Sequence, residues 1–478
     1  MRASHTFLQS SSASSATETL HILLVTETWQ PDINGVAMSL YQIVCQLVNM
    51  GHQISLLQPS FEVKRIKTLQ EKSAQTLLAE QSPLRHHAFV KGVPIPRYPQ
   101  LKFGLPSYQV LKNYITKIRP DVVHIATEGP LGLIALCVAK KLKLPVTTGY
   151  HTQFHDFSRH FGLGVVARPM MAYFKWLHNW SDATCVPSQK TENDLHQLGF
   201  KRLVQVGRGV DTKQYHPCRR SQKLRDSWKV QQHHSVLLMV SRLSPEKGVD
   251  LVIQAFKSLQ SMQLHRAMKL IIVGDGPDRS RLEALAIQSS DDIIFTGMKV
   301  GEELAEHYAS ADAFVFASQV ETFGNVVTEA MASGLPVFAF DDASAGLLVD
   351  SQCGQLVPLG KSQAFIDMVA GLPKACQLQK MGKQARLKVA SYSWQRPAEQ
   401  MQHMFMSVIH NLPINCTESH PKVDSMPLPD LSATSLSLSI PSSAQSHVYL
   451  DAKNREMINK KVVKPAIAQK ERDTALST

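Results

Sequence analysis

Short apolar runs alternate with helical patterns through the first half of the chain. Residues 21–26 are apolar and lead into turn-forming residues, and a helical pattern of apolar positions follows over 36–49. A second apolar run occupies 53–58. The same order of elements recurs at residues 121–126, 131–142 and 145–150. Strands that alternate with helices in this way predict a parallel, doubly wound sheet.

A second α/β pattern begins at residues 234–240, which form another apolar run. Further predicted strands lie at residues 269–273, 293–296, 313–316 and 336–340. Each of them precedes a helical or glycine-bearing segment, as in a parallel sheet covered by helices. The chain is therefore expected to contain a second parallel α/β domain, and the boundary between the two domains falls near 207–229.

This pattern divides the chain into five segments. They are a disordered leader over 1–20, a first α/β domain over 21–205, a second over 206–394, a C-terminal helix over 395–412 that crosses back to the first domain, and a disordered tail over 413–478. The leader is rich in Ser, Ala and Thr and lacks the charged start and long apolar run of a secretory signal. Pro and Ser dominate the tail, so we expect no packed structure there.

Length and composition agree with this division. A chain of 478 residues is too long for one core, and no window offers the ~18 consecutive apolar residues of a spanning helix. The seven cysteines are scattered without a Cys-x-x-Cys pair, so neither a disulfide framework nor a zinc site is indicated. We therefore expect a reducing, cytoplasmic location.

The net charge of +12 lies mostly in residues 1–205. A one-sided positive field suits an anionic partner such as a membrane surface, a phosphorylated acceptor or nucleic acid, and a solvated surface explains it equally well. The segment 165–180 combines large apolar residues with Arg168 and Lys175. Such a segment is suited to press on an anionic membrane, whereas the simpler interpretation is a core helix.

The strongest local signal is the segment from Glu321 to Glu329, which follows a predicted strand. Gly324 and Asn325 suit a helix start, where free backbone N–H groups bind a phosphate. If most of the segment is helical, a rise of ~1.5 Å per residue separates the two carboxylates by about 12 Å. Hydrolytic carboxylate pairs lie ~5–9.5 Å apart, so these two are expected to hold different ends of one extended ligand. The alternative is a pair of surface glutamates.

Two more candidate loops follow strands of the second domain. Arg242 and Lys247 come directly after the first strand, where an α/β sheet places its ligand crevice, and they suit a diphosphate. Gly274 and Gly276 form a Gly-x-Gly turn after the next strand, but no third glycine follows. A hydride-transfer enzyme is therefore disfavoured.

In the first domain, Gly35 lies between the first strand and its helix and permits close backbone approach to a phosphate or sugar, although a tight turn is the plainer interpretation. His151 ends a strand at the same sheet edge, so we expect it to face the ligand cleft; a buried structural histidine is an equal alternative. The acid pairs at 291–292 and 341–342 lack a supporting ligand set, so no metal site is predicted.

Together these segments resemble the family 4 retaining glycosyltransferases. The motifs that carry the resemblance are Asn34-Gly35-Val36, Tyr150-His151-Thr152, Gly207-Arg208-Gly209-Val210-Asp211, Arg242 with Lys247, Gly274-Asp275-Gly276 and the segment from Glu321 to Glu329. The resemblance covers roughly residues 21–410. It implies a GT-B fold, in which two Rossmann-like doubly wound domains face each other across a cleft, the first for the acceptor and the second for the donor.

The resemblance also implies roles for single residues. Donor-binding positions are Gly35, Arg242, Lys247, Gly274, Phe323, Gly324, Asn325 and Glu329. Within that set, Arg242 and Lys247 match the cations on the donor diphosphate, and Glu329 matches the glutamate on the ribose. The catalytic positions are His151, near the anomeric centre, and Glu321, on the sugar hydroxyls. These enzymes need no metal or other cofactor, since a helix N-terminus with Arg and Lys offsets the charge of the leaving diphosphate.

The expected activity is transfer of a hexose, with mannose from GDP-mannose favoured, to a lipid or glycan acceptor in glycolipid or surface-glycan synthesis. The expected partners are this donor, that acceptor and an anionic membrane contacted peripherally, and no nucleic acid. One alternative is a non-catalytic nucleotide-binding protein on a GT-B frame. Another is a glucosyltransferase of the glycogen-synthase type. A phosphorylase of the glycogen type needs a lysine-bound pyridoxal phosphate, and no segment of the sequence supports such a site.

Overall fold

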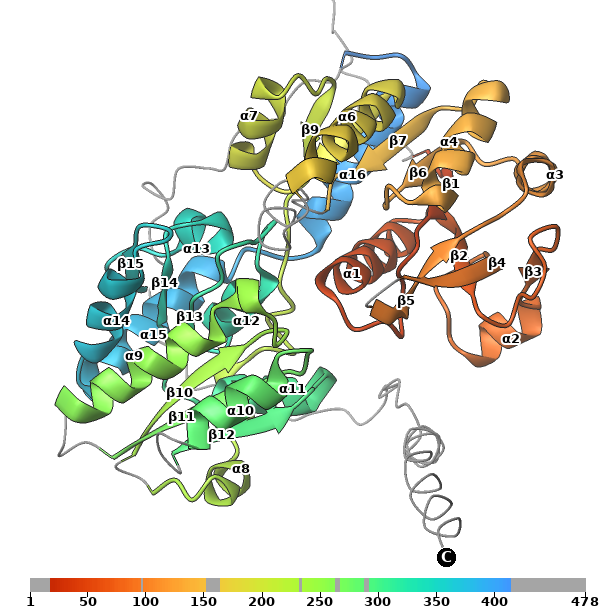
Figure 1. Cartoon of the computed structure of the whole chain (residues 1–478). Coiled ribbons are helices and arrows are strands. Elements are labelled where there is room, and N and C mark those ends of the chain that lie inside the picture. Colours follow the sequence, from red (N-terminus) through yellow and green to blue (C-terminus); the bar gives the residue numbers. More distant parts are fainter. Residues whose placement is uncertain are drawn as a thin grey trace, which may run out of the picture. The chain divides into compact units, whose positions relative to one another are not determined.

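The computed structural model describes residues 18–95, 98–151, 164–231, 234–262, 267–287 and 292–413. All of these except Leu78–Gln81 belong to one compact unit. The predicted leader and tail lie outside the described residues, apart from 18–20 and 413. Within the described unit the chain builds two α/β domains (Figure 1).

The first domain is a nine-stranded sheet in the order β3-β4-β2-β1-β6-β7-β8-β9, with β5 paired to β4. Its strands are β1 (His21–Val25), β2 (Gln53–Ser60), β3 (Gln70–Glu71), β4 (His86–Ile95), β5 (Tyr98–Gly104), β6 (Val122–Ile125), β7 (Val146–Gly149), β8 (Ala183–Val186) and β9 (Leu203–Gln205). Among these described strands, β3 and β5 are the two that run antiparallel to their neighbour β4. Because β1 pairs with both β2 and β6, the strand order reverses at β1.

Helices cover the faces of this sheet, as its continuously buried strands require. They are α1 (Gly35–Asn49), α2 (Ala74–Ala79), α3 (Tyr108–Ile118), α4 (Pro130–Lys141), α6 (Gly164–Trp180) and α7 (Gln189–Gln197). α1 begins at Gly35 because the Asn34 side chain accepts hydrogen bonds from the backbone N–H groups of Val36 and Ala37. The amphipathic patterns predicted over 36–49 and 131–142 correspond to α1 and α4.

The second domain is a six-stranded parallel sheet in the order β12-β11-β10-β13-β14-β15. Its strands are β10 (Ser235–Val240), β11 (Met268–Val273), β12 (Ile293–Gly297), β13 (Ala313–Phe316), β14 (Val337–Phe340) and β15 (Gly354–Val357). Its helices are η1 (Pro217–Arg219), α8 (Gln222–Ser227), η2 (Pro245–Lys247), α9 (Val249–Met262), α10 (Arg279–Ile287), α11 (Gly301–Ser310), α12 (Asn325–Ala332), α13 (Ala343–Leu348), α14 (Ser362–Ala370) and α15 (Ala375–Val389). Here the order reverses at β10, which pairs with β11 and β13.

The last described helix, α16 (Gln395–Ile409), belongs to the core of the first domain. Phe405 is fully buried in a cluster with Leu24 of β1 and Leu40 of α1, and its ring lies 5.6 Å from that of His124. The Gln400 side chain accepts a hydrogen bond of 2.9 Å from the backbone N–H of Gly207. The chain therefore completes the first domain only after it has built the second.

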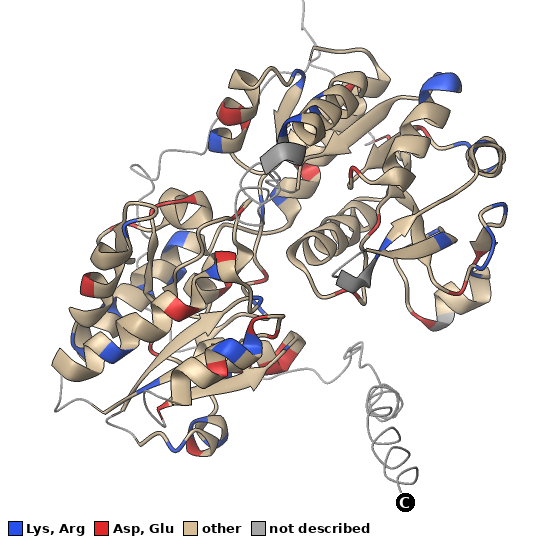
Figure 2. Cartoon of the chain, viewed as in Figure 1, with Lys and Arg blue, Asp and Glu red and all other residues tan. Residues whose placement is uncertain are grey.

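Charged side chains are spread over both domains. In the view of Figure 2, Lys and Arg are interspersed with Asp and Glu on the helices of each domain. None of the helices in the described part of the chain has both the length and the apolarity that a bilayer crossing requires.

Candidate active site

The loop after β10 carries the two candidate cations at the point where the second sheet reverses. Arg242 is exposed, and its guanidinium makes no hydrogen bond or ion pair with the described residues. Lys247 ends η2, and its Nζ donates to Oε1 of Glu321 at 2.6 Å and to the carbonyl of Val320 at 3.2 Å. The ion pair therefore joins the loop after β10 to the loop after β13, and Arg242 remains available to an anion.

Glu321 lies in the loop before α12 and not within that helix. α12 begins at Asn325, so the axial rise calculated from Glu321 to Glu329 does not apply. The reason is Gly324, whose φ of 84° breaks the helical backbone before that point. The two glutamates are nevertheless separated by environment: Glu321 pairs with Lys247, whereas Glu329 contacts tyrosine.

The start of α12 has no side-chain cap. Gly324 is its N-cap, and Ser344 Oγ donates to the Gly324 carbonyl at 2.8 Å. Phe323 is buried beneath this turn. Asn325 Nδ2 donates to Oγ of Ser39 on α1 at 2.9 Å. Backbone N–H groups at an uncapped helix start attract an anion, so this turn suits a phosphate beside Lys247.

Glu329 lies one turn into α12 and is held by tyrosine hydroxyls. Tyr308 of α11, fully buried, donates to its Oε2 at 2.9 Å. Burial raises the pKa of Glu329 to about 7, and its hydrogen bonds from Tyr308 and Tyr215 partly oppose that rise. The Tyr215 and Tyr308 rings meet edge to face, 5.6 Å apart. No sequence pattern singled out either tyrosine.

The side chain of His151 points into the first domain. A Cβ at Gly149 would lie 2.4 Å from its Nε2, so the ring folds back along β7. Arg208 Nη2 lies 2.9 Å from its Nδ1. Burial and the Arg208 charge hold the pKa of His151 well below its usual range, so the ring is neutral. The ring is therefore buried against Arg208, and its place near the anomeric centre stays a prediction. The backbone carbonyl of His151 accepts a hydrogen bond from Thr322 Oγ1 at 3.0 Å.

The candidate glycines differ in what surrounds them. A Cβ at Gly35 would meet no atom within 4 Å, so packing does not require glycine there and the space before α1 is open. At Gly274, φ is +136° and a Cβ would lie 1.8 Å from the carbonyl oxygen of Ser241. The Gly274 N–H already donates to the carbonyl of Gly297. Gly274 is therefore explained by the close packing of two backbone segments.

One buried cluster has the composition of a metal site. Ligand atoms of His124, His151 and Cys185 lie within 4.8 Å of one another. Arg208 faces the His151 Nδ1, so Nδ1 accepts and Nε2 keeps the proton of the neutral ring. Burial also raises the pKa of Cys185 to about 11, which keeps its thiol protonated. Beside the Arg208 cation, these groups do not fit a metal ion. Of the acid pairs, Asp342 contacts Lys190, and Asp291 lies outside the described residues.

Comparisons with known proteins match this architecture. Residues 33–214 match the family model described as Glycosyltransferase Family 4, and residues 220–388 match the model described as Glycosyl transferases group 1. A GDP-mannose-dependent alpha-mannosyltransferase from Mycobacterium tuberculosis is 33% identical over 377 residues, which cover 78% of this chain and 93% of that protein. An alpha-monoglucosyldiacylglycerol synthase from Streptococcus pneumoniae is 29% identical over 67% of this chain and 71% of its own length.

Among solved structures, sucrose-phosphate synthase from Thermosynechococcus elongatus superposes with a TM-score of 0.62 at 19% identity, over 82% of this chain and 100% of that chain. Two doubly wound domains and this likeness define the GT-B fold, and the two family models define a glycosyltransferase. The chain belongs to glycosyltransferase family 4.

Proposed function

We propose that this protein transfers a hexose, with mannose from GDP-mannose favoured, to a hydroxyl group of a glycolipid acceptor with retention of configuration. The observation that carries the proposal is the Lys247–Glu321 pair next to the uncapped start of α12, with Arg242 on the same loop as Lys247 and without a side-chain partner among the described residues. The more similar of the two relatives is a GDP-mannose-dependent mannosyltransferase and the other is a monoglucosyldiacylglycerol synthase, so mannose is favoured over glucose.

The residues divide the work of binding and bond breaking. Arg242, Lys247 and the first turn of α12 hold the donor diphosphate and offset its charge as it leaves, so no metal ion is needed. Glu321 accepts hydrogen bonds from sugar hydroxyls, and Glu329 accepts them from the ribose. The bond from the anomeric carbon to the diphosphate oxygen breaks, the acceptor oxygen bonds to the same face of that carbon, and the departing phosphate takes the acceptor proton.

The test is a screen of donor hydrolysis and thermal shift with GDP-mannose, UDP-glucose, UDP-galactose and UDP-N-acetylglucosamine. We expect GDP-mannose to give the largest shift and the fastest hydrolysis. Arg242→Ala is expected to lower turnover at least tenfold, because one charge-assisted contact to the diphosphate is worth ~1.5–3 kcal/mol. Unchanged turnover in Arg242→Ala would remove that residue from the site, and UDP-glucose as the best donor would replace mannose by glucose.

We further propose that the protein contacts an anionic membrane peripherally, and the exposed side chains of α6 support this contact. Trp176 and Trp180 are exposed on its outer face, and their rings lie 5.2 Å apart. Lys175 is exposed beside them, and Leu198 is exposed after α7. Aromatic and basic side chains together suit the interface of an anionic bilayer.

Vesicle sedimentation tests this contact. The wild type is expected to bind vesicles of anionic lipid at low salt, and the Trp176→Ala/Trp180→Ala double variant is expected to lose most of that binding. Leu387→Ala, which alters an exposed apolar residue on α15, serves as the control. Absence of wild-type binding to anionic lipid at low salt would remove the membrane contact.

A further inference from the structure

Three loops meet at the carboxyl edge of the first sheet, and the proposed donor chemistry assigns a role to none of them. Glu27 follows β1, Glu128 follows β6 and His151 follows β7. β6 pairs with β1 on one side and β7 on the other. Because neighbouring strands lie ~4.8 Å apart, the two carboxylates emerge beside the strand that carries His151. They therefore emerge at the carboxyl edge of this sheet, where an open α/β sheet places its ligand crevice.

Glu128 is a buried carboxylate, 8% exposed, with a histidine behind it. Its Oε1 lies 3.4 Å from Nε2 of His178, which is 1% exposed. That Nε2 makes no hydrogen bond with the residues that the structure describes. The hydroxyl of Tyr173 donates to the backbone carbonyl of Glu128 at 2.7 Å. Both His178 and Tyr173 belong to α6, so one helix fixes the loop after β6.

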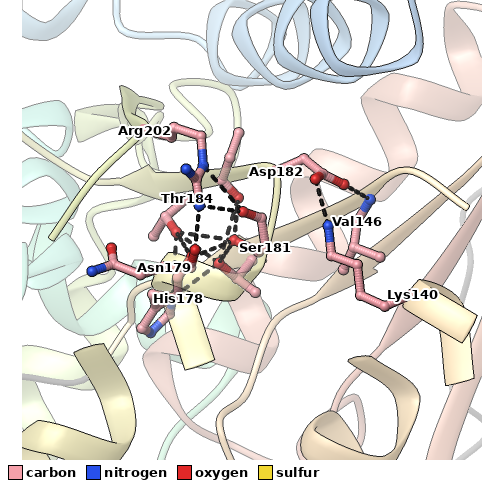
Figure 3. A network of polar contacts seen from close by, with 10 residues as sticks. Lys140, Val146, His178, Asn179, Ser181, Asp182, Thr184 and Arg202 are labelled. Atoms are coloured by element: carbon pink, nitrogen blue, oxygen red, sulfur yellow. Dashed lines mark hydrogen bonds and ion pairs between the residues drawn. The ribbon is translucent and has the colours of Figure 1, made fainter. Parts of the chain in front are cut away.

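The turn after α6 holds His178 in place. His178 Nδ1 lies 2.9 Å from Thr148 Oγ1, which in turn contacts Ser181 and Thr184. Figure 3 shows His178, Ser181 and Thr184 close together, with Arg202 directed at the same turn, where it donates to the backbone carbonyls of Asn179 and Ser181. A network of this kind orients the imidazole toward Glu128. His178 is therefore a positioning residue.

Glu27 occupies the start of α4. Its Oε1 accepts hydrogen bonds from the backbone N–H groups of Leu131 at 3.2 Å and Gly104 at 3.3 Å. A Cβ at Gly129 would lie 1.7 Å from Oε2, so glycine is required for the carboxylate to fit. A helix start is the ordinary place for a phosphate, and here the protein's own carboxylate already fills it. Burial raises the pKa of Glu27 to about 7.

Neither carboxylate is neutralised by a basic side chain. Among the described residues, no Lys or Arg forms an ion pair with Glu27 or Glu128. Glu128 lies against His178, and the Glu27 and Glu128 carboxyl groups interact with each other. Two carboxyl groups without a cation form hydrogen bonds with hydroxyl groups and offer a second anion no attracting charge. This chemistry separates neutral polyols from phosphate esters.

We propose that Glu128, supported by His178 and flanked by Glu27, binds hydroxyl groups of the acceptor, and that this edge selects an uncharged polyhydroxyl headgroup over one that bears phosphate. The inference rests on the proposed function, because it assumes that the donor binds at the second domain. It adds the chemical class of the acceptor and the residues that recognise it.

The experiment compares two acceptors in matched detergent micelles, monoglucosyl-diacylglycerol and phosphatidylinositol, with the donor that performs best in the screen. The wild type is expected to use the neutral glycolipid with at least a tenfold higher kcat/KM. Glu128→Gln is expected to raise KM for that acceptor at least tenfold, with donor KM and donor hydrolysis changed less than twofold. Glu71→Gln, an exposed carboxylate on β3, is the matched control and should change neither constant.

Several outcomes overturn the inference. Equal or better use of phosphatidylinositol by the wild type would contradict selection against phosphate, and an unchanged acceptor KM in Glu128→Gln would remove that residue. If Glu128→Gln unfolds below the assay temperature, Glu27→Gln replaces it and must raise acceptor KM and reduce the preference for the neutral acceptor. If the wild type hydrolyses none of the donors, the proposed function itself is contradicted. Failure of the acceptor inference is therefore distinguishable from failure of the proposed function.

Discussion

At the residue scale, the ionisation of the buried Glu329 couples the stability of the protein to pH. Burial raises its pKa to about 7 from an ordinary 4.5, despite the opposing hydrogen bonds from tyrosine. Between these two values the folded protein holds a proton that the unfolded chain has released. The stability that the folded protein gains by holding this proton is therefore complete below pH 4.5 and is lost as the pH rises through 7.

Glu329→Gln tests that sign, because it removes the ionisation and keeps the size of the side chain. We expect the free energy of unfolding of the wild type to fall relative to the variant between pH 5 and pH 8, by about 1–3 kcal/mol. Urea unfolding at several pH values measures the difference. Glu399→Gln, an exposed carboxylate on α16, is the control. A wild-type-to-variant difference that stays constant with pH would show that Glu329 does not titrate in this range.

At the scale of elements, Gly274 and Gly35 differ in why glycine is needed: packing requires it at Gly274 but not at Gly35. Gly274→Ala places a Cβ against the Ser241 carbonyl in a backbone conformation that favours glycine, so we expect a loss of about 2–4 kcal/mol of stability. Gly35→Ala introduces no clash at the start of α1. The variant is expected to be as stable as the wild type or more stable by up to about 1 kcal/mol.

Donor turnover distinguishes these variants further. Gly35→Ala is expected to lower turnover at least tenfold in a protein of normal stability, because its methyl group fills the open space before α1. Thermal unfolding and donor hydrolysis on the same samples measure both effects. Gly35→Ala with full turnover would show that the open space takes no part in donor binding, and Gly274→Ala with wild-type stability would contradict the packing account.

α16 supplies a further test at this scale. It follows the second domain in the sequence, yet its buried residues belong to the core of the first domain. Phe405→Ala removes a fully buried ring from the cluster with Leu24 and Leu40, and we expect a loss of about 3–5 kcal/mol. His403→Ala, exposed on the same helix, should change stability little. Calorimetry measures both variants. Equal stabilities would show that α16 does not complete the first domain.

At the scale of the whole molecule, the strands with long apolar runs were predictable, and the rest depended on pairing. β1, β6 and β10 follow from local pattern because each is buried on both faces. β8 has four residues, two of them Thr and Cys, and β9 has three, so neither produces a periodic signal. The antiparallel strands β3 and β5 could not be predicted either, because each is defined by its pairing with β4.

The candidate site divides in the same way. Loops such as that of Arg242 were predictable, because the carboxyl ends of strands at a reversal point meet in every doubly wound sheet. The partners of Glu128 and Glu329 come from helices distant in sequence, α6 and α11, which only the packed fold brings to them. The inward ring of His151 depends on Arg208, and no periodicity encodes that contact.

The central claim is that the chain moves a hexose from a nucleotide donor with retention. The most direct measurement is NMR of the product made from GDP-mannose and monoglucosyl-diacylglycerol, read through the one-bond coupling at the anomeric carbon, with release of GDP followed in parallel. The account predicts one α-linked mannose in the product per GDP released, the configuration of the donor. A β-linked product, or release of GDP no faster than donor hydrolysis alone and without any glycosidic bond to the acceptor, would contradict it.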